Sequence, residues 1–403
     1  MKKIRQKSEK TFGLPVVSWA LYDFANTIFS ILVVTRFLPP FLKEITGGSS
    51  AMGAAVAFSM VVAGLLVPIL GAISDWTGKT KRYLIYATVA SVTATAAMSF
   101  TRNIPALLAL FFAANLTYQT AMVFYNSLLP TISRPSQRGF ISGVGVSLGY
   151  AGSFAALIAA NPYVKVFGIQ NVFVFTALLF LLFSLPIFFF VEEREVEYPV
   201  TLSRRLMGQQ LQNVFQTLRE LPTYPPVLFF LLGNFFCLDA VNTTIVFYSE
   251  FLLNARSVSA TKVDLALISV QLAALFFSLL IGRLTDRVGS KTMLLWVSAA
   301  WIGAIGLILI SSTYTVVLIA SIIGGFGLGG IWVAGRTMML ELVPPERVGA
   351  FLGLYGMTGK FSALGALWFG LLADWLSYES ALFFQLIMLA LGMYFFSKIK
   401  TRV

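Results

Sequence analysis

Long apolar runs alternate with short polar segments along the whole chain of 403 residues. A helix that crosses a bilayer needs about 20 mostly apolar residues, and roughly twelve runs meet that length. Their approximate bounds are 15–42, 51–74, 81–100, 104–130, 139–161, 170–191, 225–253, 263–283, 291–311, 314–341, 347–373 and 378–398. We therefore predict an all-α polytopic membrane protein with about twelve transmembrane helices in two bundles of six.

One long polar segment separates the two sets of runs. The predicted organisation is a bundle over residues 1–191, a cytoplasmic linker over 192–224 and a second bundle over 225–403. The linker begins with acidic residues and continues with apolar positions at helical spacing. It could form a helix that lies on the inner membrane surface, or serve only as a tether.

Composition supports this class, because 58% of the residues are hydrophobic and only 11% are charged. The net charge of +12 comes from Lys and Arg in short loops, as topology requires, so no nucleic-acid partner is expected. With both termini cytoplasmic, 21 of the 29 Lys and Arg residues fall on the inner side and only five on the outer side. We expect an integral protein of the cytoplasmic (inner) membrane, with no cleaved signal peptide.

Several kinds of chemistry lack the residues they need. The chain has no His and a single Cys, Cys237, which lies inside an apolar run. Neither a metal cluster nor a Ser-His or Cys-His nucleophile can be assembled from these residues. No phosphate-binding loop of the Gly-x-x-x-x-Gly-Lys type is present, which argues against ATP-driven transport. We therefore expect neither an enzyme nor a cofactor.

A glycine-aspartate motif recurs at about half the chain length. Residues Gly71, Asp75, Gly78 and the basic Arg82 stand between two apolar runs, and Gly282, Asp286 and Gly289 repeat the spacing 211 residues later. A second pair of markers, Gly143 and Gly353, is separated by 210 residues. Two markers at nearly one offset predict that the halves are parallel repeats.

The loop that begins at Gly71 resembles the loop between helices two and three of the major facilitator superfamily. Shorter stretches resemble the vacuole effluxer family within it; they are SWALYDFAN from Ser18, DAVNT from Asp239 and FLGLYGMTGK from Phe351. The resemblance implies two six-helix bundles, alternating access and a motif that braces the halves in one state. It also implies that the first helix of each half faces a central cavity. Read from its residues alone, the motif could simply be a charged loop that satisfies topology.

Polar side chains inside the predicted spans are the candidate substrate-binding or coupling residues. Asp23 and Asn26 stand three residues apart on the first span, and Asp239 and Asn242 repeat that spacing on the seventh. Charged groups within a spanning helix are costly and usually face water or a partner. These residues could line the substrate path, anchor a helix end or form ion pairs between helices.

Two further spans carry candidate polar groups. Asn115, Tyr118, Gln119 and Asn126 form one stripe on the fourth span, and Arg336 takes the place of Asn126 on the tenth. Such a stripe could line a cavity or hydrogen-bond other helices. Arg336, like Arg36, lies near a helix end, which favours an anchor at the membrane surface.

Lys360 stands near the middle of the eleventh span, where its ammonium needs an anion. The hypothesis is that Asp239 pairs with Lys360 and that a solute carboxylate displaces it.

These observations predict a monomeric secondary or facilitative transporter of small organic solutes, with amino acids as the class that fits a paired acid and base. Proton coupling and uniport both remain open, since buried carboxylates could carry a proton. One alternative is a broad efflux carrier for drugs or lipids. Another is a membrane sensor that does not transport.

Overall fold

The computed structural model describes residues 13–133, 138–193, 208, 212, 216–310, 313–343 and 348–400. All regular structure in these residues is helical, as the apolar runs predict. The predicted linker lies largely outside the described residues, so its proposed surface helix stays a prediction. The surroundings of the motif residues Gly71, Asp75 and Asp286 also lie outside the description.

The N-terminal half consists of long helices joined by short turns. In chain order they are α1 (Leu14–Phe29), η1 (Ser30–Phe37), α2 (Leu38–Thr46), α3 (Ser50–Thr77), α4 (Thr80–Ala97), η2 (Met98–Phe100), α5 (Ile104–Ile132), α6 (Arg138–Phe167), η4 (Ile169–Asn171) and α7 (Val172–Phe190). The first crossing is continuous through α1, η1 and α2.

The C-terminal half repeats this arrangement after the short η5 (Leu221–Thr223). It comprises α9 (Pro225–Asn254), α10 (Ala260–Val288), α11 (Ser290–Ile310), α12 (Tyr314–Leu342), α13 (Val348–Phe361), η7 (Ser362–Leu364), α14 (Gly365–Trp375) and α15 (Tyr378–Lys398).

Among the described residues, eleven helices are long and apolar enough to cross a membrane. The twelfth crossing is α13, η7 and α14 together, because a turn of 3₁₀ helix at Ser362–Leu364 divides it into two shorter helices. The prediction of about twelve crossings is therefore confirmed. Apolar side chains such as Phe58, Phe100 and Phe276 remain exposed on the outer surface of the bundle, as contact with lipid requires.

The middle of the first crossing is a π-helix, η1. Pro39 and Pro40 follow it and have no N–H to donate to the carbonyls one α-helical turn earlier. The altered winding lets the chain remain helical while its later turns are rotated relative to α1. Arg36 lies in this segment, which faces the C-terminal half through α9.

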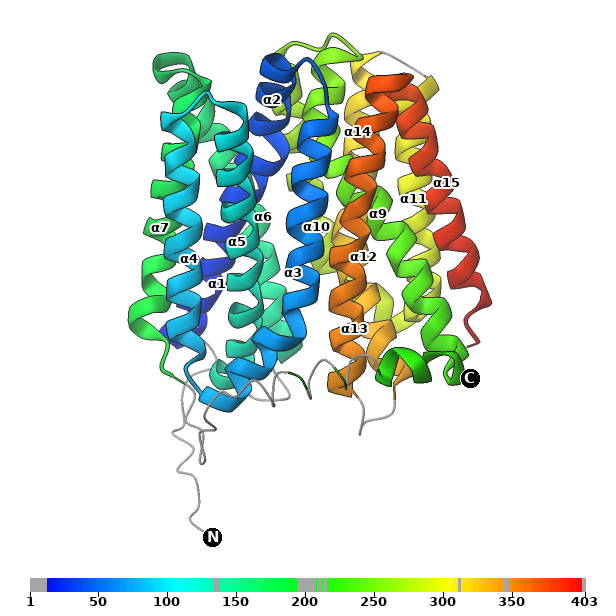
Figure 1. Ribbon diagram of the computed structural model, residues 1–403. Coiled ribbons are helices and arrows are strands. Elements are labelled where there is room, and N and C mark those ends of the chain that lie inside the picture. The colour runs from blue at the N-terminus through cyan, green and yellow to red at the C-terminus, as the bar shows by residue number, and fades with distance from the viewer. Residues whose placement is uncertain are drawn as a thin grey trace.

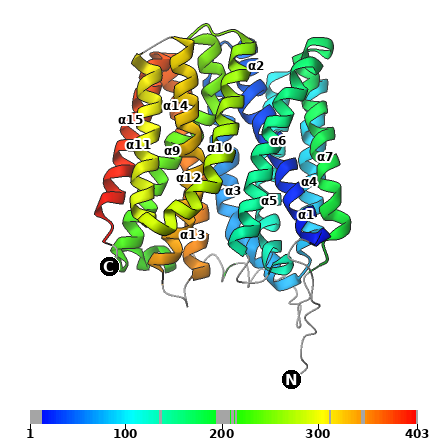
Figure 2. The same cartoon turned by 180° about the vertical axis from the view of Figure 1, so that it is seen from behind.

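The two halves pack against each other in a reciprocal manner. Helix α3 of the N-terminal half contacts α13 and α14, while α10 of the C-terminal half contacts α6. Figures 1 and 2 show the halves side by side, with α3 next to α14 on one side of the boundary and α10 next to α6 on the other. Helix α1 begins and α15 ends at one face, which we call the terminal face, and the turn at 47–49 marks the opposite, distal face (Figure 1).

Candidate substrate path and gate

Asp23 lies in the N-terminal half, buried between α1 and α6. Its Oδ1 accepts a hydrogen bond from Asn26 Nδ2 at 2.8 Å. It fits there because Gly145 and Gly149 of α6 leave room, and Trp19 stacks on Tyr125 beside it with ring centroids 4.4 Å apart. The predicted pair, Asp23 and Asn26, is thus joined by a hydrogen bond beside aromatic side chains.

Asp239 occupies the equivalent place in the C-terminal half. Its carboxylate lies against the backbone of Gly365 at the start of α14, and a Cβ added to that glycine would overlap both carboxylate oxygens. Asp239 follows Asp23 by 216 residues, and Gly365 follows Gly149 by the same number. Asn242 donates to Ser362 Oγ at 3.2 Å instead of bonding its neighbouring acid. The repeat preserves the acid and the glycine but changes the partner of the amide.

Lys360 lies at mid-membrane at the end of α13 and joins the two halves. Its Nζ donates to Gln119 Oε1 of α5 at 2.5 Å. Its Cβ lies close to Gly64 of α3. The described ion pairs do not include Asp239 with Lys360, so the predicted pairing is absent from this conformation. Asp239 is held within its own half by Gly365, whereas Lys360 extends into the other half.

The predicted polar stripe on α5 serves more than one purpose. Gln119 bonds Lys360, and Tyr118 packs on Phe29 with ring centroids 4.9 Å apart. Asn115 is buried and donates to Ser59 Oγ of α3 at 2.8 Å, so it joins two helices of the same half. Asn126 is exposed and donates to Met122 O in its own helix. The stripe therefore combines a contact between halves with hydrogen bonding between helices.

Arg336 and Arg36 differ more than their positions in the sequence indicate. Arg336 is exposed on α12 of the C-terminal half. Arg36, by contrast, is only 4% exposed, and its Nε forms an ion pair with Asp264 Oδ1 of α10. The prediction of a surface anchor is wrong for Arg36, because η1 directs it towards the C-terminal half and α10 supplies a buried carboxylate.

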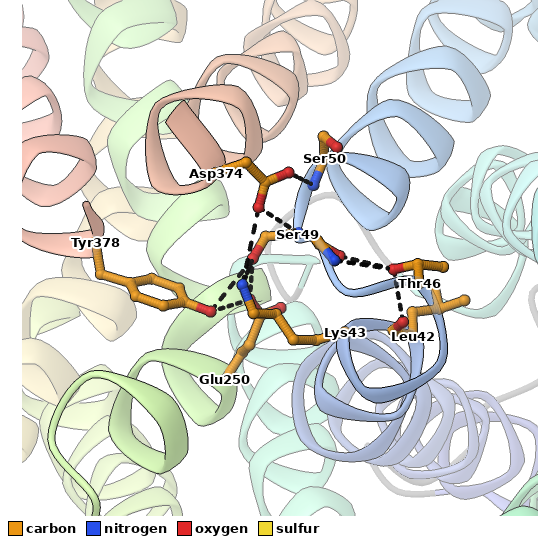
Figure 3. A network of polar contacts seen from close by, with 9 residues as sticks. Leu42, Lys43, Thr46, Ser49, Ser50, Glu250, Asp374 and Tyr378 are labelled. Carbon is orange, nitrogen blue, oxygen red and sulfur yellow. Dashed lines mark hydrogen bonds and ion pairs between the residues drawn. The ribbon is translucent and has the colours of Figure 1, made fainter. Parts of the chain in front are cut away.

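A second polar network, shown in Figure 3, joins the halves at the distal face. Glu250 of α9 is fully buried, and its Oε1 accepts from Ser49 Oγ and from Tyr378 Oη, the latter at 2.6 Å. Asp374 of α14 accepts from the backbone N–H of Ser49 at 2.7 Å and that of Ser50 at 2.9 Å. This network and the ion pair between Arg36 and Asp264 form what we call the distal gate.

Lys43 adds a base to the same gate. Its Nζ lies 3.2 Å from Ser49 Oγ and 3.8 Å from Asp374 Oδ1, and it covers the ring of Tyr378. Its side chain is 23% exposed and that of Asp374 is 19% exposed, so this pair closes the gate towards the distal solution. The distal gate therefore has a partly exposed outer layer, formed by Lys43 and Asp374, over the buried Glu250.

The glycine-aspartate motifs are only partly visible. Gly78 and Gly289 adopt φ angles of +66° and +84°, which glycine tolerates and other residues disfavour. Gly289 ends α10, and Gly282 has open space around it. Arg82 pairs with Glu193 at 3.6 Å, at the start of the predicted linker. The roles expected for Gly71, Asp75 and Asp286 stay predictions.

Sequence reasoning missed most of the distal gate, although one signal was present. Glu250 falls on the same face of its helix as Asp239, three turns away, within an otherwise apolar run. Asp264 and Asp374 stand close to helix ends, where a carboxylate normally meets water and attracts no attention. Only the packing of distant helices shows that all three acids meet residues of the other half.

Known proteins resemble this chain along nearly its full length. The family model of the Major Facilitator Superfamily matches residues 20–256 and 230–402. The "Uncharacterized MFS-type transporter YxiO" of Bacillus subtilis (strain 168) is 28% identical across 94% of this chain and 93% of that protein. A "Multi-drug resistance efflux pump PmrA homolog" of Lactococcus lactis subsp. lactis (strain IL1403) is 22% identical across 91% of this chain and 89% of that protein.

More distant likenesses agree on the fold. The "Autophagy-related protein 22" of Saccharomyces cerevisiae (strain ATCC 204508 / S288c) is 22% identical across 81% of this chain and 74% of that protein. A crystal structure of a point mutant of the nucleoside transporter NupG superposes with a TM-score of 0.78 at 14% identity, over 96% of this chain and 100% of that one. This structural likeness shows the fold alone. With the family model matching both halves, the chain belongs to the Major Facilitator Superfamily and is a membrane transporter rather than an enzyme.

Proposed function

We propose that the protein carries small organic solutes that bear a carboxylate, with amino acids as the expected class, by alternating access between the two halves. It would do so as a monomer in the cytoplasmic membrane, with the terminal face towards the cytoplasm. The excess of Lys and Arg in loops on that side supports this orientation. The distal gate is closed in the structure, so the path would open towards the terminal face.

The observation that carries the proposal is the environment of Lys360. Its ammonium lies at mid-membrane, and its hydrogen-bond partner, Gln119, is a neutral amide from the other half. A partly buried ammonium within a membrane-spanning segment is costly unless an opposite charge compensates it. A solute carboxylate would supply that charge and would displace a weak bond between the halves. Binding of an anionic group and relative movement of the halves would thereby be linked.

Asp23 supplies the complementary group for an amine. Its carboxylate is buried beside Trp19 and Tyr125, and the faces of aromatic rings attract ammonium groups. A zwitterion with its carboxylate on Lys360 and its amine towards Asp23 would contact both halves. The resemblance of the stretches from Ser18, Asp239 and Phe351 to the vacuole effluxer family supports the same solute class.

Counterflow of labelled leucine and tyrosine in proteoliposomes tests the proposal. We expect exchange by the unaltered protein and a loss of about 10- to 100-fold in apparent affinity for Lys360→Ala, because a hydrogen bond to a charged group contributes about 1.5–3 kcal/mol. Lys165→Ala, at an exposed position on α6, is the matched control and should exchange normally. Equal affinity in the Lys360→Ala and unaltered proteins would refute the assignment of Lys360.

Efflux of apolar drugs is the second candidate, favoured by the likeness to the PmrA homolog. An apolar solute gives Lys360 no anion, so such a carrier would tolerate Lys360→Met. Dye efflux that is unaffected by Lys360→Met, together with no amino-acid counterflow, would select this function over the first.

A further inference from the structure

Three buried acceptor groups line one face of α9. Asp239, Thr243 and Glu250 are spaced by four and seven residues, which places them above one another on a helix. They are 5%, 0% and 0% exposed. Each carries an oxygen without a hydrogen-bond partner among the described residues, namely Asp239 Oδ2, Thr243 Oγ1 and Glu250 Oε2. Buried oxygens in such a column are normally satisfied by ordered water.

The column begins at the distal gate. Glu250 Oε1 is held by one hydroxyl from each half, Ser49 and Tyr378, while Oε2 faces no donor in the described part of the chain. An ionised carboxylate with an unpaired oxygen is far more costly to bury than a neutral carboxyl group. The closed gate therefore favours a proton on Glu250.

The other charged groups around Glu250 do not replace that proton. Lys43 from α2 acts on Glu250, but its Nζ lies 3.8 Å from Asp374 Oδ1 and above the ring of Tyr378. Asp374 from α14 carries a like charge and is already bonded to the backbone of Ser49 and Ser50. Tyr378 from α15 is a hydrogen-bond donor to Glu250. The base and the second acid act on Glu250 in opposite directions, and Glu250 forms no ion pair among the residues described.

We propose that Glu250 is a proton-binding site of the distal gate and that Thr243 and Asp239 continue from it as a hydrated proton path along α9. In the open gate, water reaches Glu250 and the carboxylate takes a proton from the distal solution. Closing the gate buries the neutral carboxyl group. The proton then passes through water past Thr243 to the Asp239 carboxylate, about 16 Å further along the helix, and leaves to the opposite side.

This inference rests on the proposed transport function and makes its coupling ion a proton. One proton enters and one leaves, and no other reactant is consumed. Because closure requires a protonated Glu250, a lower pH favours the closed gate and a higher pH favours the open gate. A carrier that works as a uniporter would lack this dependence on Glu250.

Distances between spin labels on the distal face test the gate without any solute. Labels at Glu44→Cys and Thr261→Cys, both exposed positions on opposite halves, would be placed in a Cys237→Ser background. We expect the distance to increase as the pH is raised, because an ionised Glu250 favours the open gate. In Glu250→Gln, which cannot ionise, the distance should be the same at every pH. The matched control, Ser249→Ala, removes the buried hydroxyl of the adjacent residue, which cannot ionise, and should follow the unaltered protein.

A second measurement separates the path from the gate. In proteoliposomes with an imposed pH gradient, Glu250→Gln should exchange solute but lose accumulation against its gradient, and Thr243→Val should slow accumulation about tenfold, as for the loss of about 1.4 kcal/mol. A distance in Glu250→Gln that follows pH as before, or accumulation unchanged in both variants, would overturn the inference. If the unaltered protein shows no counterflow, the proposed function fails, and the spin-label result still decides the role of Glu250.

Discussion

The two halves share one framework but carry opposite polar groups where they meet. At the distal gate the N-terminal half supplies bases and hydroxyls, Arg36, Lys43 and Ser49, and the C-terminal half supplies the acids. At mid-membrane the roles reverse, since Lys360 donates from the C-terminal half to Gln119. The repeat thus fixes how helices pack, and substitutions within it decide how the halves attract each other at each depth.

The two equivalent acid sites, at Asp23 and Asp239, also share a backbone arrangement but differ in their polar partners. Asp23 and Asp239 each lie against a glycine of the fifth crossing of their own half, but Asp23 bonds its neighbour Asn26 while Asp239 keeps one oxygen without a described partner. The N-terminal acid is therefore satisfied locally, and the C-terminal acid belongs to the column along α9. Identical positions in a repeat can serve a binding surface in one half and a proton path in the other.

Breaking the ion pair between the halves should have the largest effect. Arg36→Ala leaves the Asp264 carboxylate buried and unpaired, which costs about 3–5 kcal/mol. We expect a marked decrease in the thermal unfolding temperature of the purified protein. Arg36→Leu combined with Asp264→Leu should recover most of it, because no buried charge remains. A double variant no more stable than Arg36→Ala would show that the pair does not act as a unit.

Alanine substitution of the glycines that contact the two acids, Gly365 and Gly149, should lower stability by unequal amounts. A Cβ at Gly365 would overlap the Asp239 carboxylate, whereas a Cβ at Gly149 would meet Thr27 Cγ2 at 3.1 Å and Asp23 O at 3.5 Å. Gly365→Ala should lower the free energy of unfolding by about 1–3 kcal/mol, as overpacking does.

Gly149→Ala, with room for a small shift, should cost clearly less in the same thermal unfolding assay. Equal losses in both variants would mean that the two acid sites are packed alike.

Removing a charge from the outer layer of the distal gate should have the smallest effect on stability. Lys43 and Asp374 are both partly exposed and 3.8 Å apart, so Lys43→Ala should change stability by about 0–1 kcal/mol. The effect should shrink further at high salt. A loss as large as that of Arg36→Ala would show that Lys43 stabilises Glu250 directly and would weaken the case for a proton there.

Several site predictions depended on local sequence and others required the packed helices. The spacing of Asp23 with Asn26 was visible because a helix brings residues three apart together, and the structure records that bond. The partner of Lys360 was not visible, because the hypothesis looked for an anion and named Asp239, whereas the structure records the neutral amide of Gln119. Arg36 was misassigned since its depth was judged along a regular helix, whereas prolines after η1 alter the winding there.

By itself the sequence determined the membrane class, the number of crossings and the division into two related halves. These follow from desolvation, because each run of about 20 apolar residues must leave water whatever surrounds it. Only the tertiary structure decided which polar groups of the two halves meet. Lys360 with Gln119, Arg36 with Asp264 and Glu250 with Ser49 join residues more than 200 positions apart. Such pairings depend on how whole helices dock, and no local pattern in the chain encodes them.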